Sequence, residues 1–211
     1  MDIRQCREED LDLLERHMPS PGRTQRHAMR FEKQQQGLST FLVAWSDGIP
    51  VGTAQILWQG CEAPEVRERF PECPELNGLG VWPPQLRSQG IGTAIIRAAE
   101  TQAHRCGHHR IGLGVDDRNY RAASLYLRLG YQETDCHYLD RYHYLDENGL
   151  RHEVADACRF LVKQLTGQPS WPQPGRHPHQ ERECLQEHLE ATQVRPWAHR
   201  IPRGKSCSGE V

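Results

Sequence analysis

Residues 75–96 read Glu-Leu-Asn-Gly-Leu-Gly-Val-Trp-Pro-Pro-Gln-Leu-Arg-Ser-Gln-Gly-Ile-Gly-Thr-Ala-Ile-Ile, a pattern that predicts a strand, a proline-bearing loop and a helix beginning at Ile91. Gly90 and Gly92 carry no Cβ, so a ligand can approach the backbone closely. The first turn of the helix presents N–H groups without intrahelical acceptors, together with the positive end of the helix dipole. Arg87 adds a permanent, forked positive charge. The stretch therefore predicts a site for an anion, and a diphosphate fits it best.

Two commoner phosphate-binding motifs do not match this loop. A Walker loop ends in Gly-Lys-Ser/Thr, and the dinucleotide fingerprint needs a third glycine three residues after the second, where this chain has Ile95. On these residues alone, a glycine-rich loop that merely caps a core helix remains the alternative.

Two motifs at a fixed separation decide between these readings. Arg87, Gly90 and Gly92 form Arg-x-x-Gly-x-Gly after a Val-x-Pro at residues 81–83, and residues 119–131 read Asn-Tyr-Arg-Ala-Ala-Ser-Leu-Tyr-Leu-Arg-Leu-Gly-Tyr. The first resembles the acetyl-CoA signature of the GNAT superfamily of N-acetyltransferases, of bacterial type. The second resembles the same family's Asn-x-x-Ala…Leu-Tyr-x-x-x-Gly-Phe/Tyr motif. The resemblance covers roughly residues 1–165.

The resemblance implies a GNAT-like α/β (α+β) fold, with a mixed central β-sheet flanked by helices and splayed central parallel strands. The pantetheine arm of the co-substrate, acetyl-CoA, would lie in the splayed gap and pair with the exposed backbone. The implied cofactor-binding residues are Leu79, Gly80, Val81, Arg87, Ser88, Gln89, Gly90, Ile91, Gly92, Thr93, Asn119 and Tyr126.

Acetyl transfer to an amine needs a neutral nucleophile, a donor for the developing oxyanion and a proton for the departing thiolate. The resemblance places Tyr126 as the acid, and the N–H of Leu79 or Val81 as the donor. For the base we expect Glu75. If the bulge marked by the strand's glycines preserves the alternation of side chains, Glu75 shares a face with Asn77, Leu79 and Val81. Asp116 and Glu72 stay open as alternatives.

The periodicity along the chain agrees with this fold. It predicts a short strand at 3–6, a helix that opens at 7–10 and is ended by Pro19-Ser-Pro-Gly22, a helix at 24–36, and an antiparallel hairpin of 40–45 and 51–58 around the Asp47-Gly48 turn. A loop at 59–74 with a helical turn near Val66 precedes the strand 76–81, and a helix at 91–106, a strand at 110–115 and a helix carrying Tyr126 follow.

A second hairpin, 132–144 with 150–165, is predicted around Asp146-Glu-Asn-Gly149. Its first strand carries Tyr138, Tyr142 and Tyr144 with Asp140 between them. These side chains suit a pocket for a cationic amine, and an edge hairpin with cross-strand aromatic pairs is an equal alternative.

Composition excludes several classes of protein. The net charge of −2 provides no general attraction to nucleic acid, and no apolar run is long enough to span a membrane. The N-terminus has no basic region followed by an apolar stretch, so we expect a cytoplasmic protein. The eight cysteines are scattered without a Cys-x-x-Cys motif, and adjacent His108 and His109 on a strand point to opposite faces, so we expect free thiols and no metal.

We therefore expect a GNAT domain at residues 1–166 that transfers acetyl from acetyl-CoA to a primary amine of a small molecule, such as an aminoglycoside-like compound, an amino acid or a polyamine. A protein N-terminus or lysine is the alternative acceptor, and a non-catalytic acyl-CoA-binding module is the alternative outside the enzyme class. A homodimer is compatible with the sequence.

Residues 167–211 are rich in proline and histidine, and we expect a largely flexible tail there. Ending the chain near residue 168 should therefore leave a folded domain that still binds CoA, and limited proteolysis of the full chain should cut the tail first. Cooperative thermal unfolding of the truncated protein checks this. Loss of cooperativity would mean that Leu185 and Leu189 dock on the domain.

Overall fold

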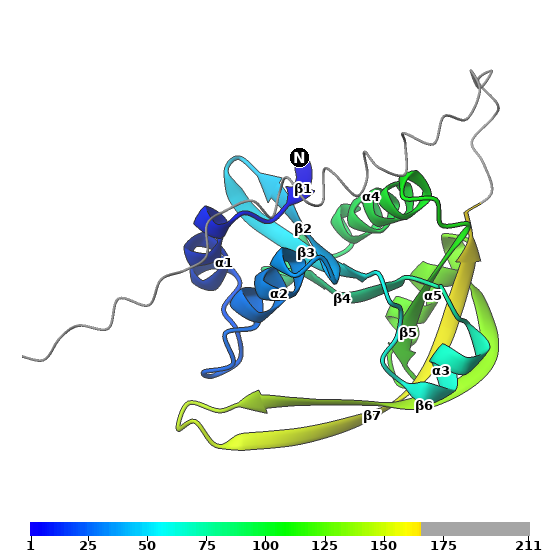
Figure 1. Ribbon diagram of the computed structural model, residues 1–211. Helices are drawn as coiled ribbons and strands as arrows, with labels where there is room; N and C mark the ends of the chain where they lie inside the picture. Colours follow the sequence, from blue (N-terminus) through cyan, green and yellow to red (C-terminus); the bar gives the residue numbers. More distant parts are fainter. Residues whose placement is uncertain (166–211) are drawn as a thin grey trace, which may run out of the picture.

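The computed structural model describes residues 1–165, whose strands form one mixed sheet (Figure 1). The strands are β1 (Asp2–Gln5), β2 (Ser39–Ser46), β3 (Ile49–Leu57), β4 (Glu75–Val81), β5 (Arg110–Asp116), β6 (Gln132–Leu145) and β7 (Arg151–Gln164). The helices are η1 (Glu8–Asp10), α1 (Leu11–His17), α2 (Arg26–Gln35), α3 (Pro64–Arg69), η2 (Pro84–Leu86), α4 (Ile91–Arg105) and α5 (Tyr120–Arg128). Each element expected within residues 1–165 is present, with boundaries shifted by a few residues.

The sheet has seven strands in the order β1-β2-β3-β4-β5-β7-β6. All neighbours are antiparallel except β4 and β5, which are parallel. This arrangement confirms the fold class predicted from the sequence, a mixed sheet with a parallel central pair.

The parallel pair separates almost as soon as it forms. Glu75 pairs with Gly112, the Gly112 N–H donates to the Pro74 carbonyl at 2.9 Å, and no later residue of β4 pairs with β5. β5 meanwhile pairs with β7 along its whole length. The edge of β4 that faces β5 is therefore left with unpaired backbone groups, as the splayed strands of the prediction require.

A bulge interrupts β4 on its other side. The register against β3 shifts between Thr53 and Gln55, and Gly78 opposite that shift has φ of +60°, a conformation that favours glycine. The bulge reverses the alternation of side chains, so Leu79 packs with Leu76 against the α4 core. The expectation that Glu75 shares a face with Leu79 and Val81 is wrong for this reason.

Helices cover the two faces of the sheet. α4 packs on one face over Ala54, Ile56, Leu76 and Leu113, and the inner side of α5 joins the same core. α1 and α2 cover the other face over Phe41, Val43 and Trp45. A smaller core beneath α3 joins Cys61, Val66, Cys136, Tyr138 and Phe160.

The β6–β7 hairpin is long and returns beneath α2 (Figure 1). Its tip is tied to the loop before α2, because the Arg23 N–H donates to the Leu145 carbonyl at 3.0 Å and the Leu145 N–H donates to Thr24 Oγ1 at 3.0 Å. The hairpin and α2 thus form two fixed sides of the region in front of β4.

Cys6, Cys61, Cys73, Cys136 and Cys158 are buried free thiols, as expected, but Cys106 is not a free thiol, so the expectation is wrong for that residue. No three His, Cys, Asp or Glu side chains within residues 1–165 gather as a metal site requires. None of the helices in this part of the chain is long and apolar enough to cross a bilayer. The tail predicted at 167–211 lies outside the described residues.

Candidate active site

The glycine loop forms an open anion site at the start of α4. Ser88 and Gly90 have φ of +64° and +88°, a left-handed conformation that in loops can present successive N–H groups to an anion. No side chain caps α4, whose first internal hydrogen bond runs from the Ala94 N–H to the Gly90 carbonyl at 2.9 Å. A Cβ at Gly90 would meet nothing within 4 Å. The N–H groups of Gly92 and Thr93 are thus left for a ligand.

The end of β4 lies against the start of α4. A Cβ at Gly92 would be 3.9 Å from both Leu79 Cδ2 and Val81 Cγ2. The Arg87 side chain folds back and donates from Nε to the Val81 carbonyl at 3.4 Å. The structure therefore brings together the predicted cofactor residues of β4 and those of the loop.

The hydrogen-bond pattern of β4 identifies the donor that faces the gap. The Trp82 N–H donates to the Val51 carbonyl at 3.0 Å. Because residues of an antiparallel ladder alternate in direction, the N–H of neighbouring Val81 points away from β3 and toward the open side. Of the two donors predicted, Val81 is therefore the one that the ladder favours.

α5 closes the site from the far side. Asn119 caps this helix, with Oδ1 accepting from the Ala122 N–H at 3.1 Å, and Arg121 donates to the Ser88 hydroxyl. Tyr126 is 8% exposed, in the core that also receives Leu79 and Val81, and its ring lies edge-on to Tyr131 at 6.0 Å. Burial raises the pKa of Tyr126, so its hydroxyl keeps its proton at neutral pH.

Glu75 occupies the other side of the gap. It is 3% exposed, and Asn77 Nδ2 donates to its Oε1 at 3.2 Å. Burial raises its pKa to about 7, while hydrogen bonds from Asn77 and Cys61 partly offset that effect and nearby Asp140 adds to it. A carboxylate with this pKa is matched to accepting a proton near neutrality.

The two alternative bases fit less well. Asp116 receives a bidentate contact from Arg118, and this hydrogen bonding lowers its pKa, which makes it a weaker base. Glu72 lies outside the region in front of β4, in a pocket lined also by His108 and Gln164.

Acid and base candidates thus lie on opposite faces of the sheet at the separated strands. Tyr126 belongs to the core under α4. Glu75 is electrostatically coupled to Cys61 and Asp140 on the face that α2, α3 and the hairpin border. A thioester in the gap would have Tyr126 on one side and Glu75 on the other.

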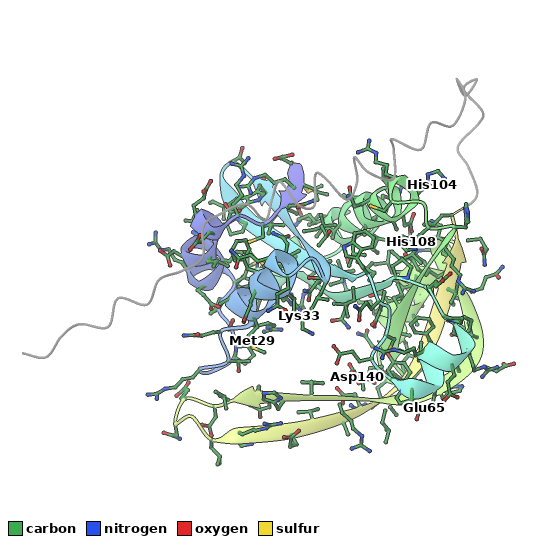
Figure 2. The ribbon with its side chains drawn as sticks, in the orientation of Figure 1. Met29, Lys33, Glu65, His104, His108 and Asp140 are labelled. Carbon is green, nitrogen blue, oxygen red and sulfur yellow. The ribbon has the colours of Figure 1, made fainter. Side chains whose placement is uncertain are left out.

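The side chains predicted to line a pocket on β6 divide between the core and the surface. Tyr138 is buried against Phe160, while Tyr142 is exposed and its hydroxyl donates to Asp156 Oδ2 at 3.1 Å. Tyr144 stacks on His152, as an edge hairpin with cross-strand pairs would show. Figure 2 shows Asp140 on β6 across from Met29 and Lys33 on α2. The Tyr144–His152 pair supports the edge-hairpin alternative, and the pocket for a cationic amine stays a prediction.

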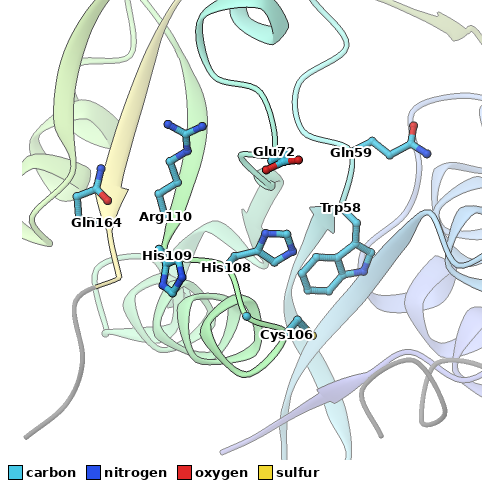
Figure 3. Close-up of a pocket in the computed structure, with 9 residues that line it drawn as sticks. Trp58, Gln59, Glu72, Cys106, His108, His109, Arg110 and Gln164 are labelled. Atoms are coloured by element: carbon cyan, nitrogen blue, oxygen red, sulfur yellow. The ribbon is translucent and has the colours of Figure 1, made fainter. Parts of the chain in front are cut away.

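A pocket of about 800 Å³ lies elsewhere, at the C-terminal end of α4 (Figure 3). Trp58 stacks on His108 at 5.6 Å between their ring centroids, and Glu72 and Arg110 also line it. This pocket is at the opposite end of α4 from Gly90 and contains none of the predicted cofactor residues.

The model of the Acetyltransferase (GNAT) family matches residues 7–131, more than half of the chain. The chain belongs to the GNAT acetyltransferase family. It is accordingly an acyltransferase, and the two stretches that resemble the family's motifs, Arg87–Gly92 and Asn119–Tyr131, lie within the matched part. No curated protein matches the chain in sequence.

Solved structures share the fold at low identity. The ribosomal-protein-S18-alanine N-acetyltransferase of Escherichia coli is 17% identical, with a TM-score of 0.52 over 81% of this chain and 98% of that one. An aminoglycoside 6'-acetyltransferase type Ii is 19% identical, with a TM-score of 0.51 over 80% and 100%. The PaiA N-acetyltransferase of Thermoplasma acidophilum, in complex with coenzyme A, is 16% identical, with a TM-score of 0.53 over 77% and 98%.

Sequence reasoning missed two residues at this site. Arg121 gives no periodic or motif signal for its contact with Ser88. Arg30 was missed because the apolar residues of α2 do not show which side of the helix faces the sheet. In the structure α2 buries the polar His27 and leaves the apolar Met29 47% exposed.

Glu75 should make stability depend on pH. Its pKa is raised from 4.5 to about 7 in the folded protein, so the folded state binds this proton more tightly and stability falls as pH rises through that interval. Glu75→Gln should remove this dependence and raise the free energy of unfolding at pH 8 by about 3 kcal/mol. Urea unfolding at pH 5 and pH 8 measures it, with exposed Glu68→Gln as the control. An unchanged pH dependence in Glu75→Gln would contradict the raised pKa.

Proposed function

We propose that the protein is an N-acetyltransferase that moves an acetyl group from acetyl-CoA to a primary amine of a small molecule, by direct attack within a ternary complex. The observation that carries this proposal is the gap between β4 and β5 that opens after the single pair Glu75–Gly112 and reaches the anion site of Gly90–Thr93 at its far end, beside Val81. Together they supply a slot for an extended arm and a site for its diphosphate.

The residues present fit CoA. The diphosphate would be held by the N–H groups of residues 88–93 and the charge of Arg87, and the pantetheine arm would pair with the open edge of Leu79, Gly80 and Val81. Acetyl-CoA supplies the activated thioester. The free Val81 N–H is the donor positioned to polarise the thioester carbonyl.

Glu75 and Tyr126 would handle the protons. Glu75 accepts the proton of the attacking amine, directly or through water, and the C–N bond forms as the C–S bond breaks. Tyr126 gives its proton to the departing sulfur. An amine of pKa about 10.4 costs roughly 4.6 kcal/mol to deprotonate at pH 7, whereas moving a proton from a tyrosine of about 10 to a thiolate of about 8.5 costs roughly 2 kcal/mol. Deprotonating the amine costs more free energy than protonating the thiolate, so the base, Glu75, has to overcome the larger of the two costs.

The region in front of β4 favours a small acceptor. The β6–β7 hairpin closes onto the loop before α2 through Leu145, Arg23 and Thr24, so this region is bordered on several sides. A protein acceptor would have to enter with an extended terminus or side chain, which stays the competing candidate within the class.

Gly92→Glu should abolish binding of CoA and acetyl-CoA, through bulk and through charge repulsion of the diphosphate. Wild-type protein should bind CoA in the micromolar range and gain thermal stability by mass action. Calorimetry and thermal shift measure both. Thr101→Glu, which adds the same charge to an exposed position of α4, is the control and should bind as wild type does. A wild-type protein that ignores CoA would refute the proposal.

Tyr126→Phe should lower kcat with little change in acetyl-CoA affinity, because the ring still packs while the proton donor is gone. The matched control is Tyr131→Phe, which removes a hydroxyl from the adjoining buried ring. CoA release against a panel of amines, with chemistry rate-limiting, is the assay. Full kcat in Tyr126→Phe would remove Tyr126 from the acid role, and a non-catalytic module would show binding without any release.

A further inference from the structure

Arg30 on α2 is held in one place over the sheet. Its guanidinium lies over the Phe41 ring at 5.8 Å, and its Nη1 reaches Thr53 Oγ1 at 3.5 Å. A Cβ on Gly78 would collide with Nη2, so the guanidinium occupies the space that this glycine leaves open at the bulge of β4. The backbone of α2 is fixed as well, since Gln34 donates to the Cys6 carbonyl at 2.8 Å and accepts from the Phe41 N–H at 2.8 Å.

The positive charge of Arg30 has no counter-charge within residues 1–165. Its one hydrogen bond is the long contact with neutral Thr53, although a guanidinium offers several donors. Burial and the nearby Arg26 lower its pKa to about 10, and no carboxylate contributes. Arg30 is half-buried, and a charge that is partly withdrawn from water without a counter-charge is costly. Its position beside a reaction site therefore calls for an explanation.

Two carboxyl groups on the same side of the sheet are also without a cationic partner. Glu75 is bonded to neutral Asn77. Asp140 forms no ion pair among the described residues and stands directly opposite Asp156 in the β6–β7 ladder, and burial, Asp156 and Glu62 raise its pKa. Neither carboxyl group contributes to the pKa of Arg30, so the cation and the anions do not neutralise one another.

We propose that the acceptor carries a carboxylate next to its reactive amine, as a free amino acid does, with Arg30 binding the carboxylate and Glu75 and Asp140 facing the amine. This inference rests on the proposed function, because it names the substrate class of the same site. Arg30 is a specificity-determining residue in this account. The planar fork of a guanidinium suits a carboxylate, which it can bind through two parallel hydrogen bonds.

Other ligands satisfy fewer of these charges. A polyamine or aminoglycoside would meet Glu75 and Asp140 favourably, but it would bring a further cation toward Arg30. The diphosphate of CoA has its own site at Gly90–Thr93, beyond the opposite end of β4 from Glu75. A zwitterion is the class that pairs every unpartnered charge described above.

The test compares each amino acid with the amine that remains when its carboxylate is removed. Alanine with ethylamine, phenylalanine with phenethylamine, and lysine with cadaverine are suitable pairs, assayed by CoA release with saturating acetyl-CoA. Wild-type enzyme should prefer the amino acid of at least one pair by about 30-fold or more in kcat/KM, the size expected when a charge pair that the bound ligand shields from water loses one partner.

Variants assign that preference to Arg30. Arg30→Gln should lower kcat/KM for the preferred amino acid by about 30-fold or more, mainly through KM, and leave its decarboxylated partner within about threefold. Arg30→Lys should restore part of the loss, because it keeps the charge without the fork. Arg26→Gln removes the same charge from an exposed position one turn earlier and should behave as wild type. Acetyl-CoA affinity and cooperative unfolding, measured for each variant, should stay unchanged.

The possible results distinguish a failure of the Arg30 assignment from a failure of the proposed acetyltransferase function. Transfer to the amines without preference for any amino acid, or an equal loss for both members of a pair in Arg30→Gln, would overturn the Arg30 assignment and leave the acetyltransferase intact. A lowered acetyl-CoA affinity in Arg30→Gln would assign Arg30 to the co-substrate and overturn the assignment as well. Binding of acetyl-CoA without transfer to any member of the panel would overturn both proposals.

Discussion

The lost pairing between β4 and β5 is the constraint on which the site depends. The two strands share the pair Glu75–Gly112 and then separate, while β3 holds β4 on one side and β7 holds β5 on the other. Unpaired backbone groups inside a protein are costly, so an edge left open in mid-sheet is stable only where solvent or a ligand satisfies it. The occupant that we propose is the amide-bearing arm of acetyl-CoA, which offers donors and acceptors at strand-like spacing.

The Gly78 bulge decides which residues face which side of that opening. Before the bulge, Glu75 and Asn77 face the region bordered by α2 and the hairpin; after it, Leu79 and Val81 pack toward α4. The extra residue of the bulge therefore places Leu79 and Val81 on the Tyr126 side of the sheet, and Glu75 on the opposite side. The same glycine leaves the space that the Arg30 guanidinium fills.

Burial explains the electrostatics on both sides of the gap. Desolvation is the largest contribution to the raised pKa values of Glu75 and Tyr126 and to the lowered pKa of Arg30. Each of these groups is less stable in its charged form than it would be in water. Charged groups of this kind lower the stability of the unliganded protein, and a bound ligand of opposite charge restores that stability.

The sequence predicted the fold well because its signals are local. Periodicity, turn residues and two motifs located the strands, the hairpins and the glycine loop within residues 1–165. Prediction from the sequence failed where the position of a side chain depends on contacts with segments that are distant along the chain. The reversal of alternation after Gly78 follows from a register against β3, and the isolation of Arg30 follows from the orientation of α2, so neither can be derived from spacing along one element. The contact between Arg121 and Ser88 is of the same kind.

Amide hydrogen exchange with and without CoA tests the central claim most directly, because it reads the individual N–H groups of the open edge and the glycine loop. The account predicts that CoA slows exchange at Val81, Gly92 and Thr93, while the N–H of Trp82, already bonded to Val51, changes little. Protection at a different surface, with Val81 and the loop unaffected at saturating CoA, would contradict it.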